Sequence, residues 1–401
     1  MVHVIQPLLY DPEDPGYRSD PYPLYARLRT TEPVHRSPLG YWVLSRYADI
    51  DLVHRDPRCV RGLQPGDGMV AAWGGWSSPI AAELGSWMLL RDGVDHARFR
   101  RTVGKAFHPA AIRSLRTRIR GIVDALLDQA ASRGAMDVIG DLALPVPVAV
   151  IGELLGLPAA DPVAIGRWAR AIGRAFDEVL TSQALDEAER AIRNLTAHLK
   201  ESLEQSASPI VAALRAPTPD GEAGLSEQEL ISNLNLLFFA GFETTRNLIG
   251  NGFLALLGHP DQLARLRAEP SLVGNAVLEL LRYDSPVQAN RRVTVEPIEV
   301  GGIRIGAGEK LLLLLGAANR DPERFRDPDA LDVARRDVRP LSFGGGVHYC
   351  LGAPLAELEA EIALSTLVRR LDGVERAPGP VDWSDSVFLR GLKALPITFT
   401  P

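Results

Sequence analysis

The apolar positions of this chain recur mostly at the three- and four-residue spacing of an amphipathic α-helix. This spacing predicts helices over residues 110–131, 160–178 and 183–206. Residues 230–257 are apolar on almost every side, which predicts a long helix buried in the core. Ser226 and Glu229 precede it with the spacing of a capping box. The chain is therefore predicted to be mainly helical.

Short apolar runs bounded by turn residues predict a few small β-sheets. These runs occupy residues 41–45, 293–296, 298–305, 311–315 and 395–399. Gly301 and Gly302 predict a hairpin turn in the third run, and the last run has the pattern of an edge strand. The remaining features are short helices at 21–29 and 47–54, a surface turn at 217–221 and an irregular segment at 319–340.

Residues 60–90 form a glycine-rich stretch with the character of a loop. It contains Trp73, Trp76 and Trp87, and Glu83 is the only charged side chain from residue 69 to residue 90. Aromatic residues in such a loop fit either a packed Ω-loop or a mobile lid, and the pattern alone leaves both open.

Length and composition narrow the class of protein. The chain has 401 residues, 46% of them hydrophobic, and no polar linker divides it, so one domain over residues 1–401 is predicted. Cys59 and Cys350 are its only cysteines, which excludes a disulfide framework and fits a reducing compartment. The N-terminus lacks a signal-peptide pattern, and no run approaches the ~20 apolar residues of a membrane span. A net charge of −6 argues against general nucleic-acid binding, so a cytoplasmic protein is expected.

The middle of the predicted central helix carries residues that a buried helix disfavours. Gly241, Glu243 and the pair Thr244–Thr245 interrupt an otherwise apolar sequence, against both helix propensity and solvation. Such departures tend to mark functional sites, although a satisfied buried polar pair fits as well. The Thr244 hydroxyl is predicted to donate a hydrogen bond to the carbonyl of Ala240, four residues earlier.

A second unusual stretch covers residues 341–352, where residues 344–346 are all glycine and Cys350 follows. Glycines allow the backbone to approach a flat partner closely. A helix pattern begins directly afterwards, which places Cys350 at a helix N-terminus, where the dipole stabilises a thiolate. Such a thiolate suits one metal bond to one face of a planar cofactor. A lone cysteine can equally be structural, and a zinc site that used it with His348 would need further ligands.

Charged residues form two further patterns. Glu279 and Arg282 stand three apart, where a helix allows an ion pair. No acidic residue occurs from residue 96 to residue 120, a stretch with many arginines. It is either a solvated helix face or a docking surface for an acidic protein. His96 and Arg100 stand four apart within it, on one helix face, an arrangement that can grip carboxylates.

These patterns follow one another in a recognisable order. The pattern Phe343-x-x-Gly-x-x-x-Cys350-x-Gly, preceded by the acid–threonine pair and the Glu279–Arg282 pair, resembles the bacterial soluble cytochrome P450 family. The likeness extends from residue 21 to residue 396. It implies a mainly α fold with small β-sheets, in which a haem lies between the long central helix and the cysteine loop.

The resemblance also implies roles for individual residues. Cys350 would be the thiolate ligand of a haem b iron, with Glu243 and Thr244 as the catalytic acid–alcohol pair. Thr244 would hold dioxygen and a water molecule, while Glu243 would relay protons from the surface. The haem-binding residues carried over are His96, Arg100, Ala240, Arg292, Phe343, Gly344, His348, Cys350 and Gly352. Those that match the family's propionate positions are His96, Arg100, Arg292 and His348.

Two arginines are candidates for the third member of the ion network that the resemblance implies. Residues 322–325 match a motif known from the family, and this motif contains Arg324. Residues 327–335 match the motif that bacterial members have at this point, so we predict Arg335 as the third member of the ion network. The departures from the family pattern are Gly93-Val94 in place of two prolines and the absence of paired aspartates in residues 206–214.

The implied activity is that of a haem-thiolate monooxygenase, which uses O2 and two electrons to hydroxylate a mainly apolar small molecule. A polyketide, terpenoid or peptide of natural-product metabolism is the expected substrate class. Epoxidation or oxidative ring coupling by the same kind of enzyme stays open, as does a non-catalytic haem protein for gas binding or electron transfer. A ferredoxin-type protein with its reductase is the implied electron donor, and neither nucleic acid nor membrane is an expected partner.

By resemblance, the substrate pocket has four walls. They are residues 61–90, 236–240, 287–290 and 387–389. Gln288 and Asn290 are the expected polar anchors in an otherwise apolar wall. Phe238, Phe239 and Phe242 add aromatic bulk, with one or more of them facing the core instead. The glycines of the first wall should let it open for entry and close over a ligand.

Overall fold

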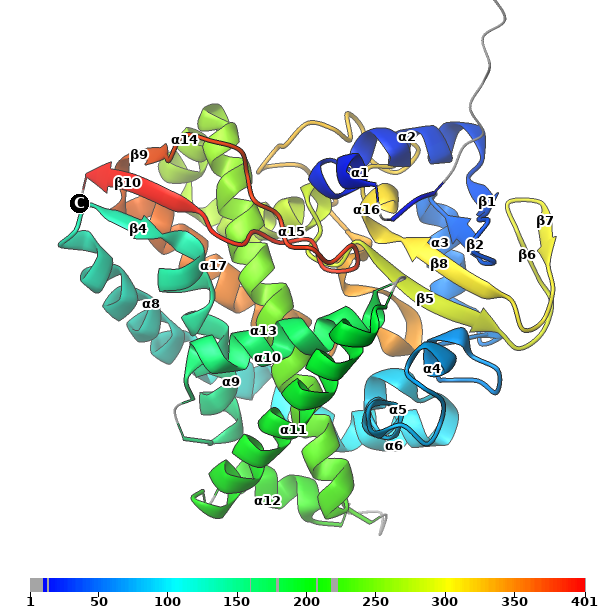
Figure 1. The fold of residues 1–401 in the computed structure, drawn as a ribbon. Coiled ribbons are helices and arrows are strands. Elements are labelled where there is room, and N and C mark those ends of the chain that lie inside the picture. The colour runs from blue at the N-terminus through cyan, green and yellow to red at the C-terminus, as the bar shows by residue number, and fades with distance from the viewer. Residues whose placement is uncertain are drawn as a thin grey trace, which may run out of the picture.

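The computed structural model describes residues 10–12, 14–158, 160–177, 180–206, 208–217 and 223–400. As predicted, helices dominate this part of the chain and the strands form small sheets (Figure 1). The helices are α1 (Pro15–Ser19), α2 (Tyr22–Thr31), α3 (Tyr47–Arg55), α4 (Gly68–Ala72), α5 (Pro79–Leu84), α6 (Gly93–Val103), α7 (Pro109–Ser114), α8 (Arg116–Ala131), α9 (Pro145–Leu155), α10 (Pro162–Gly173), α11 (Ser182–Glu204), α12 (Pro209–Arg215), α13 (Glu227–Gly258), α14 (Pro260–Ala268), α15 (Val273–Tyr283), α16 (Leu315–Ala318) and α17 (Ala353–Arg370). The strands are β1 (Val34–Arg36), β2 (Trp42–Leu44), β3 (Cys59–Val60), β4 (Ala135–Asp137), β5 (Ala289–Thr294), β6 (Ile298–Val300), β7 (Ile303–Ile305), β8 (Lys310–Leu314), β9 (Asp372–Arg376) and β10 (Pro396–Thr400).

The central helix α13 is the element against which the others pack. Figure 1 shows it running through the middle of the molecule, with α10 and α11 crossing in front of it and α17 behind. The predicted capping box is present, because Ser226 Oγ accepts from Glu229 N at 3.3 Å and Glu229 Oε2 accepts from Ser226 N at 2.9 Å. Its apolar residues are buried nearly all round, which confirms the predicted core helix.

The largest sheet has the strand order β1-β2-β8-β5-β3. Strand β8 is an interior strand that pairs in parallel with β2 and antiparallel with β5. Residues 311–314 are buried, which explains their unbroken run of leucines. The predicted hairpin is formed by β6 and β7, while the strand predicted at 293–296 begins earlier, as β5.

The prediction of an edge strand at residues 395–399 is wrong. Strand β10 lies in the middle of a sheet with the order β4-β10-β9 and pairs antiparallel with both neighbours. Its alternation of buried Ile397 and Phe399 with exposed residues reflects a sheet with one solvated face. That pattern is the same for an edge strand and for an interior one, so sequence alone did not separate them.

Residues 60–90 are more regular than a loop. They contain β3's last residue, the helices α4 and α5, and a 3-10 turn at Met88–Leu90. Both helices are capped, because Asp67 accepts from Met69 N and Ser78 accepts from Ala81 N. Helices of five and six residues are too short for apolar periodicity to reveal.

Three other predicted stretches need adjustment. The helix predicted at 110–131 is divided at Leu115 into α7 and α8, and the one at 160–178 gives way to a 3-10 turn at Arg174–Phe176. Most of the predicted turn at 217–221 lies outside the described residues. One stretch, Val138–Leu155, is apolar and long enough to cross a membrane, contrary to expectation, but 72% of it is buried inside the protein.

Candidate active site

One large cavity lies between the middle of α13 and the cysteine loop that precedes α17. It brings together residues that are far apart in the sequence, among them His96, Arg100, Thr244, Phe343 and Cys350. The cavity therefore joins the cysteine loop and the central helix in one site.

Cys350 lies where the sequence placed it, just before the first residue of α17. Its backbone N–H donates to the carbonyl of Phe343 at 2.9 Å, which closes the loop. Burial raises the pKa of the Cys350 thiol, while the backbone N–H groups of Gly352 and Ala353 oppose that shift. The predicted N–H groups are thus present, but burial outweighs them in the protein alone. A metal bound to the sulfur would deprotonate the thiol.

The glycines of the cysteine loop are needed for a reason that the sequence did not suggest. A Cβ on Gly346 would lie 2.0 Å from the carbonyl oxygen of His54, and this glycine has a φ of +63°. A Cβ on Gly345 would lie 3.0 Å from the Cβ of His54. Close packing of the loop against α3 therefore excludes a side chain at Gly346 and leaves little room for one at Gly345.

A cluster of cationic side chains occupies one end of the cavity. His96 and His348 lie with their ring centroids 4.2 Å apart, and His348 Nε2 is 2.7 Å from Asp92 Oδ1. Burial lowers the pKa of His96 to about 4, that of Arg61 to about 9 and that of Arg292 to about 10. Asp92 has a lowered pKa in spite of burial, because His348 and backbone N–H groups donate to it.

This cluster fits the two propionate groups of a haem. Arg61 and Arg100 lie on the cavity wall, and Arg292 is buried beside them, so their positive charge exceeds the single negative charge of Asp92. Buried charges require partners, and two carboxylates would supply them. Sequence reasoning missed Arg61 and Asp92, since neither belongs to a motif and only folding brings them together.

The acid–alcohol pair is divided between the cavity and the core. Thr244 Oγ1 donates to the Ala240 carbonyl at 2.7 Å, as predicted, and both residues line the cavity. Glu243 is 2% exposed and points elsewhere, with Oε1 accepting from Arg246 Nη1 at 2.9 Å. Arg170 on α10 also interacts with its charge. A relay through Glu243 stays a prediction, and it requires this carboxylate to exchange partners.

The predicted ion network is complete, and Arg335 is its third member. Glu279 is fully buried and accepts from Arg282 at 2.7 and 2.8 Å and from Arg335 Nε at 3.1 Å. Arg324 belongs elsewhere, since it pairs with Asp337 at 3.1 Å. The network fastens α15 to the segment that leads to the cysteine loop.

The apolar wall on the α13 side contains most of the predicted segments. Met88, Leu237, Val287 and Phe388 all lie on it. Gln288 does not, because its amide bonds with Tyr25 and with the Ser285 carbonyl, so the prediction of a polar anchor there is wrong. Gln288 precedes β5 and is held by these two bonds, whereas Asn290 lies within the strand and faces the cavity.

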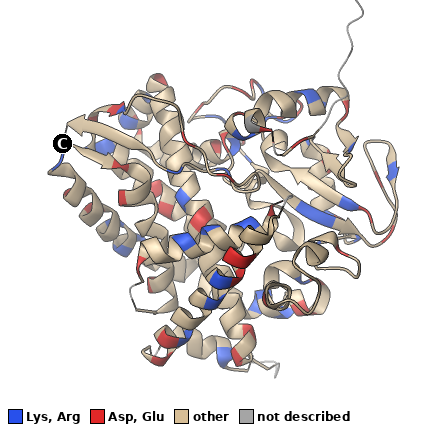
Figure 2. Ribbon diagram, in the orientation of Figure 1, with Lys and Arg blue, Asp and Glu red and all other residues tan. Residues whose placement is uncertain are grey.

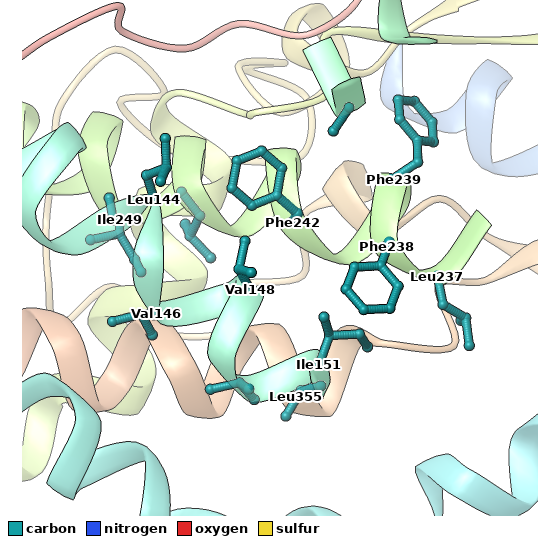
Figure 3. Packing of buried hydrophobic residues seen from close by; sticks show 14 of the residues in the cluster. Leu144, Val146, Val148, Ile151, Leu237, Phe238, Phe239, Phe242, Ile249 and Leu355 are labelled. Atoms are coloured by element: carbon teal, nitrogen blue, oxygen red, sulfur yellow. The ribbon is translucent and has the colours of Figure 1, made fainter. Parts of the chain in front are cut away.

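The three phenylalanines of α13 point in different directions. Phe239 lies on the cavity wall. Phe238 and Phe242 are buried in the hydrophobic core, where Figure 3 shows Phe242 near Leu144 and Phe238 near Ile151. Only one of the three therefore contributes to the wall.

Glu359 on α17 is a cavity residue that sequence reasoning overlooked. It is 2% exposed, and its Oε2 has no hydrogen-bond partner among the described residues. Burial raises the pKa of Glu359 well above its usual range, which favours the protonated carboxyl. An acid on the apolar face of a helix pattern was the available signal.

The glycine-rich segment is closed over the cavity. Trp73 and Trp87 are fully buried, whereas Trp76 is exposed. Glu83 accepts from Trp87 Nε1 at 3.2 Å and from Ser232 Oγ on α13 at 2.9 Å. The segment is thus packed against α13 in this structure, and its role as a mobile lid stays a prediction. The neighbouring helix α11 carries charges of both signs along its length, as Figure 2 shows.

Comparisons with known proteins identify relatives of the whole chain. The family model described as cytochrome P450 matches residues 175–379. The chain is 38% identical to the cytochrome P450 monooxygenase PikC of Streptomyces venezuelae, over 95% of this chain and 91% of PikC. It is 36% identical to the vitamin D(3) 25-hydroxylase of Pseudonocardia autotrophica, over 95% of this chain and 94% of that enzyme. The crystal structure of CalO2 superposes with a TM-score of 0.87 at 37% identity, covering 98% of this chain and 99% of CalO2. The chain therefore belongs to the cytochrome P450 family.

Proposed function

We propose that this protein is a haem-thiolate monooxygenase that hydroxylates a mainly apolar small molecule of natural-product metabolism, with Cys350 as the iron ligand. The observation that carries the proposal is the cavity that joins the half-buried Cys350, a cationic cluster and a threonine on the central helix. Membership of the family implies haem, O2, redox partners and a small-molecule substrate.

The residues that would hold the haem follow from the site. Cys350 would bind the iron, and the cationic Arg61, Arg100 and Arg292, together with the neighbouring His96 and His348, would bind the propionates. When bound, the haem supplies the reduction of O2 and the insertion of one oxygen atom into the substrate. The protein orients the substrate, excludes water and places protons.

The Thr244 hydroxyl lies on the cavity wall, where it can hold a water molecule for proton transfer. Its hydroxyl donates to the Ala240 carbonyl, which leaves the oxygen lone pairs free to accept from a water molecule in the cavity. Water bound there is positioned for proton delivery to the reacting oxygen. Glu243 is the nearest buried carboxylate along the helix. Once its ion pair with Arg246 is broken, it would supply a proton to this water.

Thr244→Ala should uncouple the consumption of nicotinamide from product formation. Without the hydroxyl, water is no longer held in place, so product per nicotinamide consumed should fall at least ~10-fold while hydrogen peroxide accumulates. Glu243→Gln should mainly slow turnover. Thr244→Ser, which keeps the hydroxyl, is the control. Unchanged coupling in both Thr244→Ala and Glu243→Gln would show that protons arrive by another route.

The substrate wall favours an apolar molecule. Apart from Asn290 and the threonines of α13, the residues above the haem site are apolar, so burial rather than hydrogen bonding supplies most of the binding free energy. The vitamin D(3) hydroxylase among the relatives is named for one apolar substrate. Steroid-like, terpenoid and polyketide compounds are therefore the first candidates.

A ligand screen tests the proposal directly. Apolar natural products should displace water from the ferric haem and shift its spectrum, and each ligand found should then be incubated with O2 and a reductase system. A product heavier by one hydroxyl oxygen supports hydroxylation, whereas an epoxide or a coupled ring identifies the alternative reactions. Tight binding of small, highly charged ligands, with apolar ones inert, would contradict the proposed substrate class.

The electron donor is proposed to be a small acidic iron–sulfur protein that docks on the cysteine-loop side. Lys105, Arg113 and Arg120 are exposed there and form no ion pair among the described residues. Gly104 lies against Leu351, so Lys105 is close to the Cys350 loop. Arg335 is not available for docking, because its side chain is 12% exposed and bound to Glu279.

Lys105→Glu with Arg113→Glu should slow reduction by a plant- or bacterial-type ferredoxin by about 10-fold at low salt. The rate for the unmodified protein should fall steeply as salt rises, because exposed charges are screened. Arg190→Glu, at an exposed position of α11, is the control for a charge reversal elsewhere. Stopped-flow reduction that is independent of both salt and the double substitution would rule out electrostatic docking on this face.

A further inference from the structure

Five aromatic side chains from separate segments pack together beside the cavity. Phe176, in the 3-10 turn after α10, contacts all the others: Phe239 at 5.6 Å, Phe388 at 6.1 Å, and Trp73 and Trp87 at 6.3 Å between ring centroids. The rings of Phe239 and Phe388 are inclined by only 13° and 22° to that of Phe176, so they stack on it. Phe176 is therefore the centre of this aromatic cluster.

The cluster has an inner and an outer layer. Phe239 and Phe388 line the cavity, whereas Phe176, Trp73 and Trp87 are not part of its wall. Phe176 is 8% exposed and lies behind the two inner rings. It touches no ligand space itself, but its ring limits how far Phe239 and Phe388 can turn away from a substrate.

The backbone around Phe176 is held by groups that do not involve its ring. Trp73 Nε1 donates to the Ala175 carbonyl at 2.9 Å, and Arg291 Nη2 donates to the Phe176 carbonyl at 3.4 Å. Asp177 accepts from Ser386 Oγ at 2.8 Å, which ties this turn to the segment of Phe388. Shortening the Phe176 side chain would leave these contacts in place and remove the ring that stacks on Phe239 and Phe388 and packs against Trp73 and Trp87.

We propose that Phe176 is a positioning residue that sets the upper size limit of the substrate by holding Phe239 and Phe388 over the cavity. This inference rests on the proposed monooxygenase function. With Phe176 in place the inner rings form a fixed apolar wall, since stacked aromatic rings in a packed interior have little freedom to move. Without it they can fold back into the vacated space and enlarge the pocket for bulky apolar molecules.

The test uses two iron-binding probes of different size, imidazole and clotrimazole, titrated into the ferric holoenzyme and followed by absorption spectroscopy. In Phe176→Ala the affinity for clotrimazole should rise by about 10-fold, while the affinity for imidazole stays unchanged. Phe176→Leu should give a smaller gain in the same direction and serves if the alanine variant does not fold. An unchanged ratio of the two affinities in either folded variant would overturn the proposal.

Phe238→Ala is the matched control, because Phe238 is a buried phenylalanine on α13 that does not line the cavity (Figure 3). It should lower the thermal stability without changing the affinity ratio. A similar change of the ratio in Phe238→Ala would mean general loosening and would also overturn the proposal. The carbon monoxide spectrum of the unmodified protein separates this failure from that of the function, since only the latter would remove the thiolate-type absorption.

Discussion

Cys350→Ala is expected to abolish oxygenation and to remove the red-shifted absorption of the reduced carbon monoxide complex. The absorption depends on a thiolate that donates electron density to the iron, and the other cysteine, Cys59, is not part of the cavity wall. Cys350→His should keep some haem, because imidazole is also an iron ligand, but should still lose the absorption and the activity. The effect is expected to be complete within detection.

Cys59→Ala provides the control for the loss of a cysteine. Cys59 lies on β3, pairs through its backbone with Thr294, and is absent from the cavity wall. Its removal should change stability slightly and leave the carbon monoxide spectrum intact. Thiolate-type absorption that survives in Cys350→Ala, or disappears in Cys59→Ala, would refute the assignment of the ligand.

Glu279→Ala should destabilise the fold by about 3–5 kcal/mol, because it leaves two buried guanidinium groups without their carboxylate. Glu279 accepts hydrogen bonds from Arg282, Arg335 and the backbone N–H of Asp332, and its side chain is fully buried. Since the network fastens the chain ahead of the cysteine loop, haem should be retained poorly as well. Chemical unfolding and the ratio of haem to protein measure both effects.

Arg324→Ala is the matched control for this prediction. Arg324 belongs to the other motif, at residues 322–325, but its ion pair with Asp337 lies at the surface. Such pairs contribute about 0–1 kcal/mol to the free energy of unfolding. It should therefore change stability little. Equal losses in the two variants would mean that burial of the network is not what stabilises this region.

Local structural features could be predicted from the sequence alone, because they depend on residues close together in the chain. Three examples are the capping box at Ser226, the hydrogen bond from Thr244 to Ala240, and the position of Cys350 before α17. Their geometry follows from the backbone of a helix, so spacing alone predicts it. The prediction of Arg335 as the third network member also came from a short motif, matched by resemblance to the family. The structure shows its hydrogen bond to Glu279.

Only the tertiary structure decided which side chains meet across long distances in the chain. It joined Arg61 and Asp92 to the cationic cluster, turned Gln288 away from the cavity, put β10 in the middle of its sheet, and stacked Phe176 behind Phe239. Periodicity shows that a residue is buried, but two buried faces of one element are equivalent in a sequence pattern. Which face meets the cavity is set by the packing of elements hundreds of residues apart, and no local spacing records that.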